Sequence, residues 1–196
     1  LNNNFRGADG PDRISPFYDE DFDSWVAPFV MGPINTRVVR RSAELLGDMY
    51  GSNFRYDEGI LTRGGPTGFL GATGIGLATG LAMATLAAPP TRKIIKRLIP
   101  KPGEGPSEQD QEHGFFEIEF KAKHPDDEGL DLRAIVKGDR DPGYGSTAKM
   151  IVESALALAH DDIKKGGGFW TPASVIGDQL LQRLPLHAGV TFELVG

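Results

Sequence analysis

The side chains best suited to chemistry lie in one charged, glycine-rich stretch, residues 138–149, whose sequence is GDRDPGYGSTAK. Arg140 is a planar cation that can hold a carboxylate or a phosphate. Tyr144 offers a phenol and Lys149 an ammonium group, and either group can donate a proton to an enolate or an imine-derived nitrogen, or stabilise it. Tyr144 and Lys149 are therefore the candidate catalytic residues.

Three interpretations of this stretch stay open. Its G-x-G-x-x-A spacing loosely matches a phosphate site at a helix N-terminus, but the carboxylates of Asp139 and Asp141 would repel a phosphate. Alternatively, the charges pair with one another and satisfy loop amides, as in a structural turn. In the third interpretation, Asp139, Arg140, Asp141 and Tyr144 bind a substrate or contact another domain.

The elements on either side position this stretch. Alternation of apolar and polar residues predicts a strand over residues 130–137. A helix follows from about residue 147 to residue 160, with Ser146 or Thr147 as its cap. Apolar residues cover most of the circumference of this helix, so we expect it to be buried.

The rest of the C-terminal half completes a mixed pattern. Residues 116–121 alternate as a half-buried strand and form a hairpin with residues 130–137. A helix begins at Pro172, with Thr171 as its cap, and residues 190–194 alternate as a closing strand. This order predicts an α+β fold: a mainly antiparallel or mixed sheet with helices packed on one face.

A second group of candidate residues lies on an amphipathic helix that begins near Asn35 or Thr36. Asn35, Arg37 and Arg40 are candidate substrate-binding residues, because the arginines could form an anion-binding edge. The alternative is a solvated face stabilised by an Arg40–Glu44 pair.

Residues 64–91 carry no charge, and small residues recur every four positions from Gly76 to Ala88. A basic segment, residues 92–97, follows directly. Three interpretations compete: a buried or substrate-covering helical hairpin, attachment to a membrane or lipid surface through residues 64–99, and a tunnel for a lipid or a long acyl chain.

Composition narrows the class of protein. The chain has 196 residues and a net charge of −6, which favours one domain over residues 1–196 and disfavours a nucleic-acid partner. Within it we expect an irregular arm over 1–24 and an apolar insertion plus linker over 64–113. Cysteine is absent and no two histidines have a metal-ligand spacing, so we expect no metal site and a cytoplasmic location, with membrane association as the alternative.

Several stretches together resemble a known family. Residues 138–150 and 153–156 look like the C-terminal part of the saccharopine dehydrogenase-like oxidoreductases. Residues 28–42, 103–107 and 171–174 with 177–178 agree with the same resemblance and occur in the expected order. The chain is most similar to the bacterial branch called trans-acting enoyl reductases, which is associated with lipid assembly.

The resemblance implies a function for a longer parent protein. In this family an N-terminal Rossmann domain binds NAD(P), and a mixed α/β domain then carries substrate and dimer contacts. No dinucleotide fingerprint occurs in this sequence. The resemblance therefore implies the C-terminal substrate-binding and dimerisation domain of an NAD(P)-dependent oxidoreductase, a homodimer that is inactive and free of cofactor without its Rossmann domain. The alternatives are a non-catalytic membrane or lipid-surface adaptor and a purely structural dimerisation module.

Overall fold

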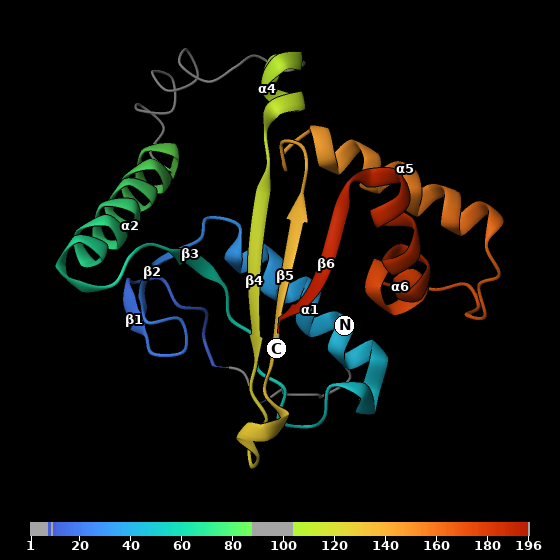
Figure 1. The fold of residues 1–196 in the computed structure, drawn as a ribbon, viewed down its shortest axis with the longest axis horizontal. Coiled ribbons are helices and arrows are strands. Elements are labelled where there is room, and N and C mark those ends of the chain that lie inside the picture. Colours follow the sequence, from blue (N-terminus) through green and yellow to red (C-terminus); the bar gives the residue numbers. More distant parts are fainter. Residues whose placement is uncertain (1–7, 9, 88–103, 196) are drawn as a thin grey trace. The chain divides into compact units, whose positions relative to one another are not determined.

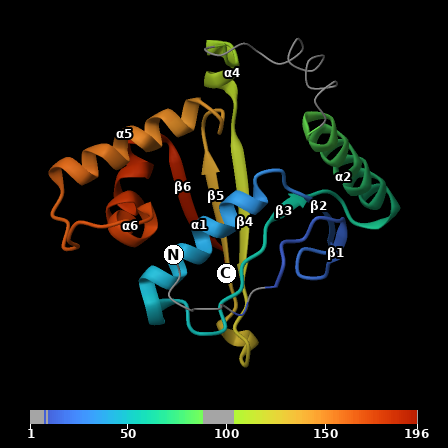
Figure 2. The same ribbon diagram turned by 180° about the vertical axis from the view of Figure 1, so that it is seen from behind.

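The computed structural model describes residues 8, 10–87 and 104–195. The chain divides into two compact units, Leu1–Lys101 (unit 1) and Pro102–Gly196 (unit 2), which are described separately. Each unit contains a three-stranded antiparallel sheet and helices (Figures 1 and 2). The α+β fold class is therefore confirmed, whereas the single domain over residues 1–196 stays a prediction.

Unit 1 contains a small sheet of order β1-β2-β3, formed by Phe17–Asp19, Ser24–Pro28 and Gly59–Leu61. The central strand buries Val26 and Ala27. The sequence predicts an irregular arm over residues 1–24, which is wrong for β1 and the start of β2. Tyr18 and Trp25 face each other across these strands with ring centroids 5.6 Å apart, and such aromatic cross-strand pairs stabilise a short hairpin.

Helix α1 (Gly32–Leu46) starts earlier than its sequence suggests, with Pro33 in its first turn. The predicted cap at Asn35 or Thr36 is wrong, because Thr36 lies inside the helix and its hydroxyl donates to the Gly32 carbonyl oxygen (2.8 Å). A short turn, η1 (Gly47–Met49), follows α1.

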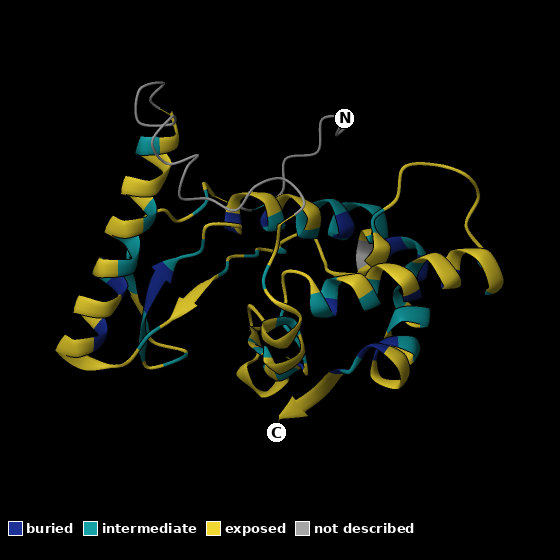
Figure 3. Cartoon of the chain, turned by 90° about the horizontal axis from the view of Figure 1, so that it is seen from above, coloured by how far each residue is buried: buried dark blue, intermediate teal, exposed yellow. Residues whose placement is uncertain are grey.

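Helix α2 (Gly65–Ala87) packs against β2 near its N-terminus. A Cβ at Gly68 would overlap the Arg63 carbonyl group, so only glycine permits this approach. Gly68 and Ala72 are the buried residues of α2, and the rest of the helix is largely exposed (Figure 3). Of the interpretations of residues 64–91, a buried hairpin is therefore wrong for the described part, 65–87, which is a single, largely exposed helix. The substrate-covering, membrane-attached and lipid-tunnel interpretations stay predictions. The basic segment 92–97 lies outside the described residues.

Unit 2 begins with α4 (Glu108–His113), a short helix within the predicted linker, whose first turn is capped by the Ser107 hydroxyl (3.1 Å from the Asp110 amide nitrogen). The linker prediction was wrong here because this single cap and its acidic first turn are enough to start a helix. A sheet of order β4-β5-β6 follows. Its strands, all antiparallel, are Phe116–Ala122, Leu132–Gly138 and Val190–Val195, with a short turn η2 (Glu128–Leu130) between the first two.

The two faces of this sheet differ as the alternation predicts. One face packs on the short helical segment η3 (Leu184–Ala188) through β6, and α5 (Gly145–His160) and α6 (Pro172–Arg183) pack on η3 and on each other. The core there is formed by Leu184, Ala188 and Val190, with Phe116 and Val136 against it. The other face carries ion pairs between neighbouring strands, such as Glu119–Arg133 at 2.6 Å. The predicted hairpin, closing strand and one-sided helix packing are thus confirmed.

The prediction that α5 is buried is wrong. Its buried residues are Ser146, Glu153 and Ala157, whereas Ile151 and Val152 are exposed by 63% and 55%. Apolar residues around a whole helix predict burial on every side, but α5 has neighbours within unit 2 mainly along the face toward α6 and η3.

An ion-pair cluster joins the ends of α5 and α6. Arg183 binds Asp161 with two hydrogen bonds, from Nε (2.7 Å) and Nη2 (2.6 Å). Its Nη1 also donates to the buried carboxylate of Glu153 (3.0 Å). This two-pronged geometry is the strong form of an arginine–carboxylate contact.

This cluster makes the stability of unit 2 sensitive to acid. Hydrogen bonds from Arg183 hold the pKa of Asp161 below its ordinary value. The stability that Asp161 contributes is therefore present above its unfolded-state pKa and is lost as the pH falls through its folded-state pKa. We expect Asp161→Asn to lower the denaturation midpoint at neutral pH, and the difference from the unmodified chain to shrink in acid. Denaturant titrations across that pH range measure it. Asp162→Asn is the control, and the same pH profile for both variants would contradict the prediction.

Candidate functional site

The candidate site is the stretch of residues 138–149 in unit 2, called here the candidate loop: it runs from the last residue of β5 through residues 139–144 to the first turns of α5. The last residue of β5, Gly138, is buried, and a Cβ there would overlap the ring of Phe116. The loop therefore starts from a fixed point in the core. Asp139 continues from it and donates its amide to the Gly189 carbonyl oxygen (3.2 Å).

The carboxylate of Asp141 organises the loop. Its Oδ2 accepts hydrogen bonds from the amides of Tyr144 (2.7 Å) and Gly145 (3.5 Å), and its backbone carbonyl accepts from the amide of Ser146 (2.8 Å). These are the amides at the start of α5. Asp141 therefore satisfies the free amides at the start of α5, the role that the sequence predicts for a serine or threonine hydroxyl.

The predicted caps at Ser146 and Thr147 are therefore wrong. Both hydroxyls donate backward instead, to the carbonyl oxygens of Arg140 (3.2 Å) and Pro142 (2.6 Å). Asp141 lies four residues before the first residue of α5, outside the N-cap position at Tyr144, so the usual capping pattern does not identify it.

Two glycines let the loop pack closely on the turn after α4. A Cβ at Gly145 would lie 2.7 Å from the Gln111 carbonyl oxygen, and one at Gly114 would lie 2.6 Å from the Asp141 amide nitrogen. The amide of Asp141 also donates to the Gln111 carbonyl oxygen (3.1 Å). The glycines of the loop therefore serve backbone packing, and the contribution of Gly114 was missed because its partner lies 27 residues on in the sequence.

The described residues do not fit the phosphates of a dinucleotide. The amides of Tyr144 and Gly145, which a phosphate would need, already donate to the Asp141 carboxylate. A second anion there would be repelled by that carboxylate. Both sheets are antiparallel throughout their described strands, whereas dinucleotide folds place the phosphates between parallel strands.

The loop presents three of its polar side chains to solvent. Tyr144 is exposed by 54% and its ring lies beside Gly105; among the described residues its hydroxyl has no hydrogen-bond partner. Lys149 lies 4.0 Å from the carboxylate of Asp139, and Arg140 lies 3.8 Å from that of Glu112. The aspartates and Arg140 thus do not pair with one another. A phenol, an ammonium and a guanidinium group are available here to an incoming molecule.

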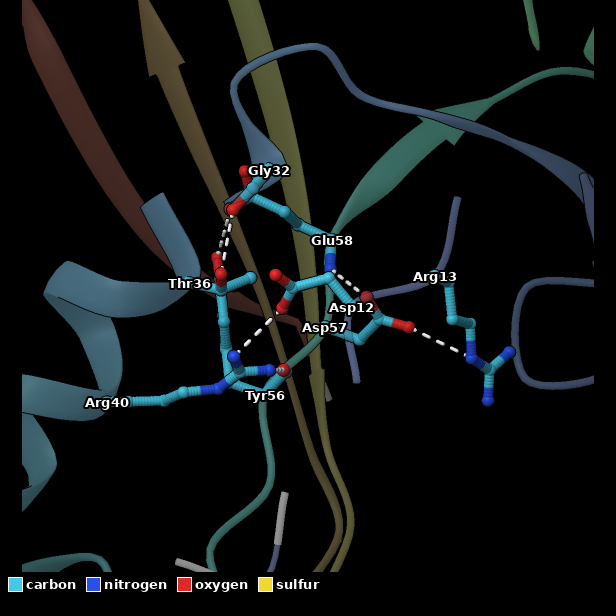
Figure 4. Close-up of polar contacts among 8 residues, drawn as sticks. All are labelled: Asp12, Arg13, Gly32, Thr36, Arg40, Tyr56, Asp57 and Glu58. Atoms are coloured by element: carbon cyan, nitrogen blue, oxygen red, sulfur yellow. Dashed lines mark hydrogen bonds and ion pairs between the residues drawn. The ribbon is translucent and has the colours of Figure 1, made fainter. Parts of the chain in front are cut away.

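Two of the three candidates in unit 1, Arg40 and Asn35, are held by neighbouring side chains and carbonyl groups; Figure 4 shows the contacts of Arg40. Arg40 forms an ion pair with Asp12 (2.8 Å), and its Nη2 donates to the Tyr56 carbonyl oxygen (3.3 Å). Asn35 donates to Oε1 of Glu58 (2.8 Å). Arg40 and Asn35 therefore fix α1 to the segments around it.

Tyr56 completes this cluster. Its hydroxyl donates to Oε2 of Glu58 (2.9 Å). Burial first, and then this hydrogen bond, raise the pKa of Tyr56 well above its ordinary value. The phenol consequently stays protonated and serves as a donor to Glu58. Neither Tyr56 nor Glu58 was identified from the sequence, because only the fold brings them to α1.

The last unit 1 candidate, Arg37, is exposed on α1, and no hydrogen bond or ion pair of its side chain is found in the described structure. The predicted Arg40–Glu44 pair is wrong, because Glu44 pairs with Arg41 (2.6 Å).

The structure thus divides the candidates between the two units. Asp139, Arg140, Asp141, Tyr144 and Lys149 lie in or next to one loop of unit 2, whereas Asn35, Arg37 and Arg40 lie on α1 of unit 1. Within residues 8, 10–87 and 104–195, no cluster of histidine and acidic side chains that could hold a metal ion is found.

Comparison with known proteins finds several relatives whose names include the words trans-acting enoyl reductase. A Mycobacterium tuberculosis relative whose name includes the words trans-acting enoyl reductase is 40% identical over 174 residues, which cover 86% of this chain and 41% of the relative. The trans-acting enoyl reductase of Mycobacterium ulcerans is 39% identical over 172 residues, or 82% of this chain and 39% of that protein. That of Mycobacterium bovis is 38% identical over 178 residues, with coverages of 85% and 40%.

The chain therefore spans about two fifths of the length of the curated relatives it matches. These relatives support the enoyl reductase branch of the resemblance. No family model matches the chain, and no solved structure matches it. Membership of the wider saccharopine dehydrogenase-like family stays a prediction.

Proposed function

We propose that this chain is the substrate-binding and dimerisation part of an NAD(P)-dependent enoyl reductase. One observation carries the proposal: 86% of the chain aligns at 40% identity with a relative named as an enoyl reductase. The chain covers 41% of that relative, so in this proposal the Rossmann domain belongs to the remainder of a longer protein. The described residues of this chain do not fit the cofactor, and we derive no step through it.

Reduction of an enoyl group also needs a proton at the carbon next to the carbonyl, and a positive group near the carbonyl oxygen. We assign the proton to the Tyr144 hydroxyl, which is exposed and has no hydrogen-bond partner among the described residues. We assign stabilisation of the enolate oxygen to Lys149, in the first turns of α5. Asp139, 4.0 Å from the Lys149 nitrogen, positions the ammonium group.

In this proposal, arginine side chains bind the negatively charged groups of the substrate. Among the described residues, the side chain of Arg140 makes one long contact, with Glu112 at 3.8 Å, so its guanidinium group is available to a carboxylate or a phosphate of the substrate. Arg37 is exposed on α1, and we propose it as a separate anion contact of unit 1. Asp141 shapes the loop, and Arg40 and Asn35 position α1.

The proposed dimer contact lies on α5. Its outward face carries three exposed aliphatic side chains, Ile151, Val152 and Leu158. Homodimer contacts are more apolar than the rest of a protein surface. A second copy covering this face would give α5 the burial that its sequence predicts.

The proposal is tested on the longer protein that contains this chain. Reduced nicotinamide cofactor is mixed with an α,β-unsaturated acyl thioester or with the saturated thioester of equal length, and oxidised cofactor is mixed with a diacid amino acid; nicotinamide absorbance is followed in each mixture. We expect cofactor oxidation with the unsaturated thioester and no change in the other two mixtures. Reduction of the oxidised cofactor by the amino acid, with no turnover of the unsaturated thioester, would overturn the proposal in favour of a saccharopine-type reaction.

A further inference from the structure

Helix α2 exposes apolar side chains that its own unit does not cover. Its N-terminal half packs on the sheet through Gly68 and Ala72, and Gly76 lies beside Pro16 and Pro28. From Leu77 onward this support ends, and a Cβ at Gly80 would meet open space. Figures 1 and 2 show the C-terminal end of α2 extending away from β1, β2 and β3.

The exposed side chains of residues 77–87 are large and apolar. Leu77 is exposed by 70%, Leu81 by 68%, Met83 by 57% and Leu86 by 38%. By length and composition, the whole helix Gly65–Ala87 is apolar enough to cross a membrane. A core helix of a water-soluble protein passes the same composition test, but it is mostly buried, and α2 is not.

The distribution of these side chains around the helix identifies the kind of partner. Successive residues turn by ~100°, so Leu77 and Leu86 lie ~180° apart, on opposite sides. A single partner helix covers a stripe ~100° wide and would leave one of these leucines in water. A lipid phase surrounds the helix on all sides.

The basic residues on either side of the uncharged run indicate which lipid head groups the helix would contact. The uncharged run lies between Arg63 and Arg92, and further basic residues follow it in sequence: Lys93, Lys96 and Arg97. Basic residues next to an apolar segment favour anionic head groups. The hydroxyl of Thr85 donates to the carbonyl oxygens of Leu81 (2.9 Å) and Ala82 (2.8 Å), so this polar group is satisfied within the helix, as an apolar medium requires.

We propose that residues 77–87 of α2 insert into one leaflet of an anionic phospholipid bilayer and anchor the protein to the membrane surface. These residues rise ~16 Å along the helix axis, which matches about half of a hydrocarbon core of ~30 Å. The N-terminal half of α2 stays on its sheet and sets the depth of insertion. This property is independent of the reductase proposal.

Flotation tests the anchor. The full chain is mixed with vesicles of equimolar phosphatidylcholine and phosphatidylglycerol and separated on a density gradient. We expect the unmodified chain to float, and Leu77→Glu with Leu81→Glu to reduce the bound fraction about tenfold or more, because charges at that depth oppose insertion. The matched control is Phe169→Glu with Leu186→Glu, two apolar residues of unit 2 that are at least as exposed. Equal flotation of both double variants with the unmodified chain would overturn the proposal.

A fluorescent label tests insertion of the helix without introducing charged side chains. The chain has no cysteine, so Leu86→Cys gives a single attachment site for an environment-sensitive dye, and Phe169→Cys gives the control site. We expect a blue shift on adding vesicles at position 86 and none at position 169. A blue shift at position 86 without vesicles that disappears when the protein is diluted would show that a second copy covers the helix and would overturn the proposal.

Discussion

Replacing Tyr144 by phenylalanine is expected to lower the turnover of an enoyl thioester by the longer protein by roughly 10²–10⁴-fold, the usual contribution of a positioned acid. The substitution removes the exposed hydroxyl and keeps the ring that lies beside Gly105. The fold should therefore be unchanged, and KM should change much less than kcat. Steady-state rates across pH, with a denaturation midpoint for each variant, measure both effects.

Tyr50→Phe is the matched control. Tyr50 is also an exposed tyrosine, and its ring packs edge to face against Phe54 in a loop of unit 1. We expect this variant to retain full activity. If Tyr144→Phe also retains full activity while both proteins stay folded, Tyr144 is a packing residue of the loop and the catalytic assignment is wrong.

Replacing Gly138 by alanine is expected to destabilise unit 2 by about 1–3 kcal/mol, the range for overpacking a filled core. The new methyl group would overlap the ring of Phe116, and that ring packs against the core of Leu184, Ala188 and Val190. The ring cannot move without displacing β6 or η3. A shift of the midpoint in denaturant at constant slope measures the loss.

Gly177→Ala is the control for this effect. Gly177 lies in α6, and a Cβ there meets no atom within 4 Å. Alanine favours a helix interior by up to ~1 kcal/mol over glycine, so this variant should be neutral or more stable. Equal destabilisation by the two substitutions would show that overlap with the Phe116 ring is not what destabilises the Gly138→Ala variant.

Much of unit 2 could be predicted because its signals are local. Alternation along residues 116–121 and 130–137 gives the hairpin, and Thr171 with Pro172 gives the start of α6, where Thr171 and Ser174 form a capping box. Such patterns need no knowledge of distant partners. The same is true of the position of the candidate loop between a strand and a helix.

What could not be predicted depends on contacts that are distant in the sequence. The Arg183–Glu153 pair spans 30 residues and Arg40–Asp12 spans 28, and no periodicity marks either one. For α2 the difficulty is different. The apolar composition of α2 predicts only that the helix is shielded from water. The structure was needed to show that the rest of unit 1 leaves most of the helix uncovered.

The most direct test of the account is to map where the acyl substrate lies. The longer protein is incubated with oxidised cofactor and an acyl thioester that carries a photoreactive group next to its carbonyl, irradiated, digested and sequenced by mass spectrometry. The account predicts labelling within residues 138–149, suppressed by excess unlabelled thioester. Labelling confined to other parts of the protein, with this loop unmodified, would contradict the claim that this chain holds the molecule being reduced.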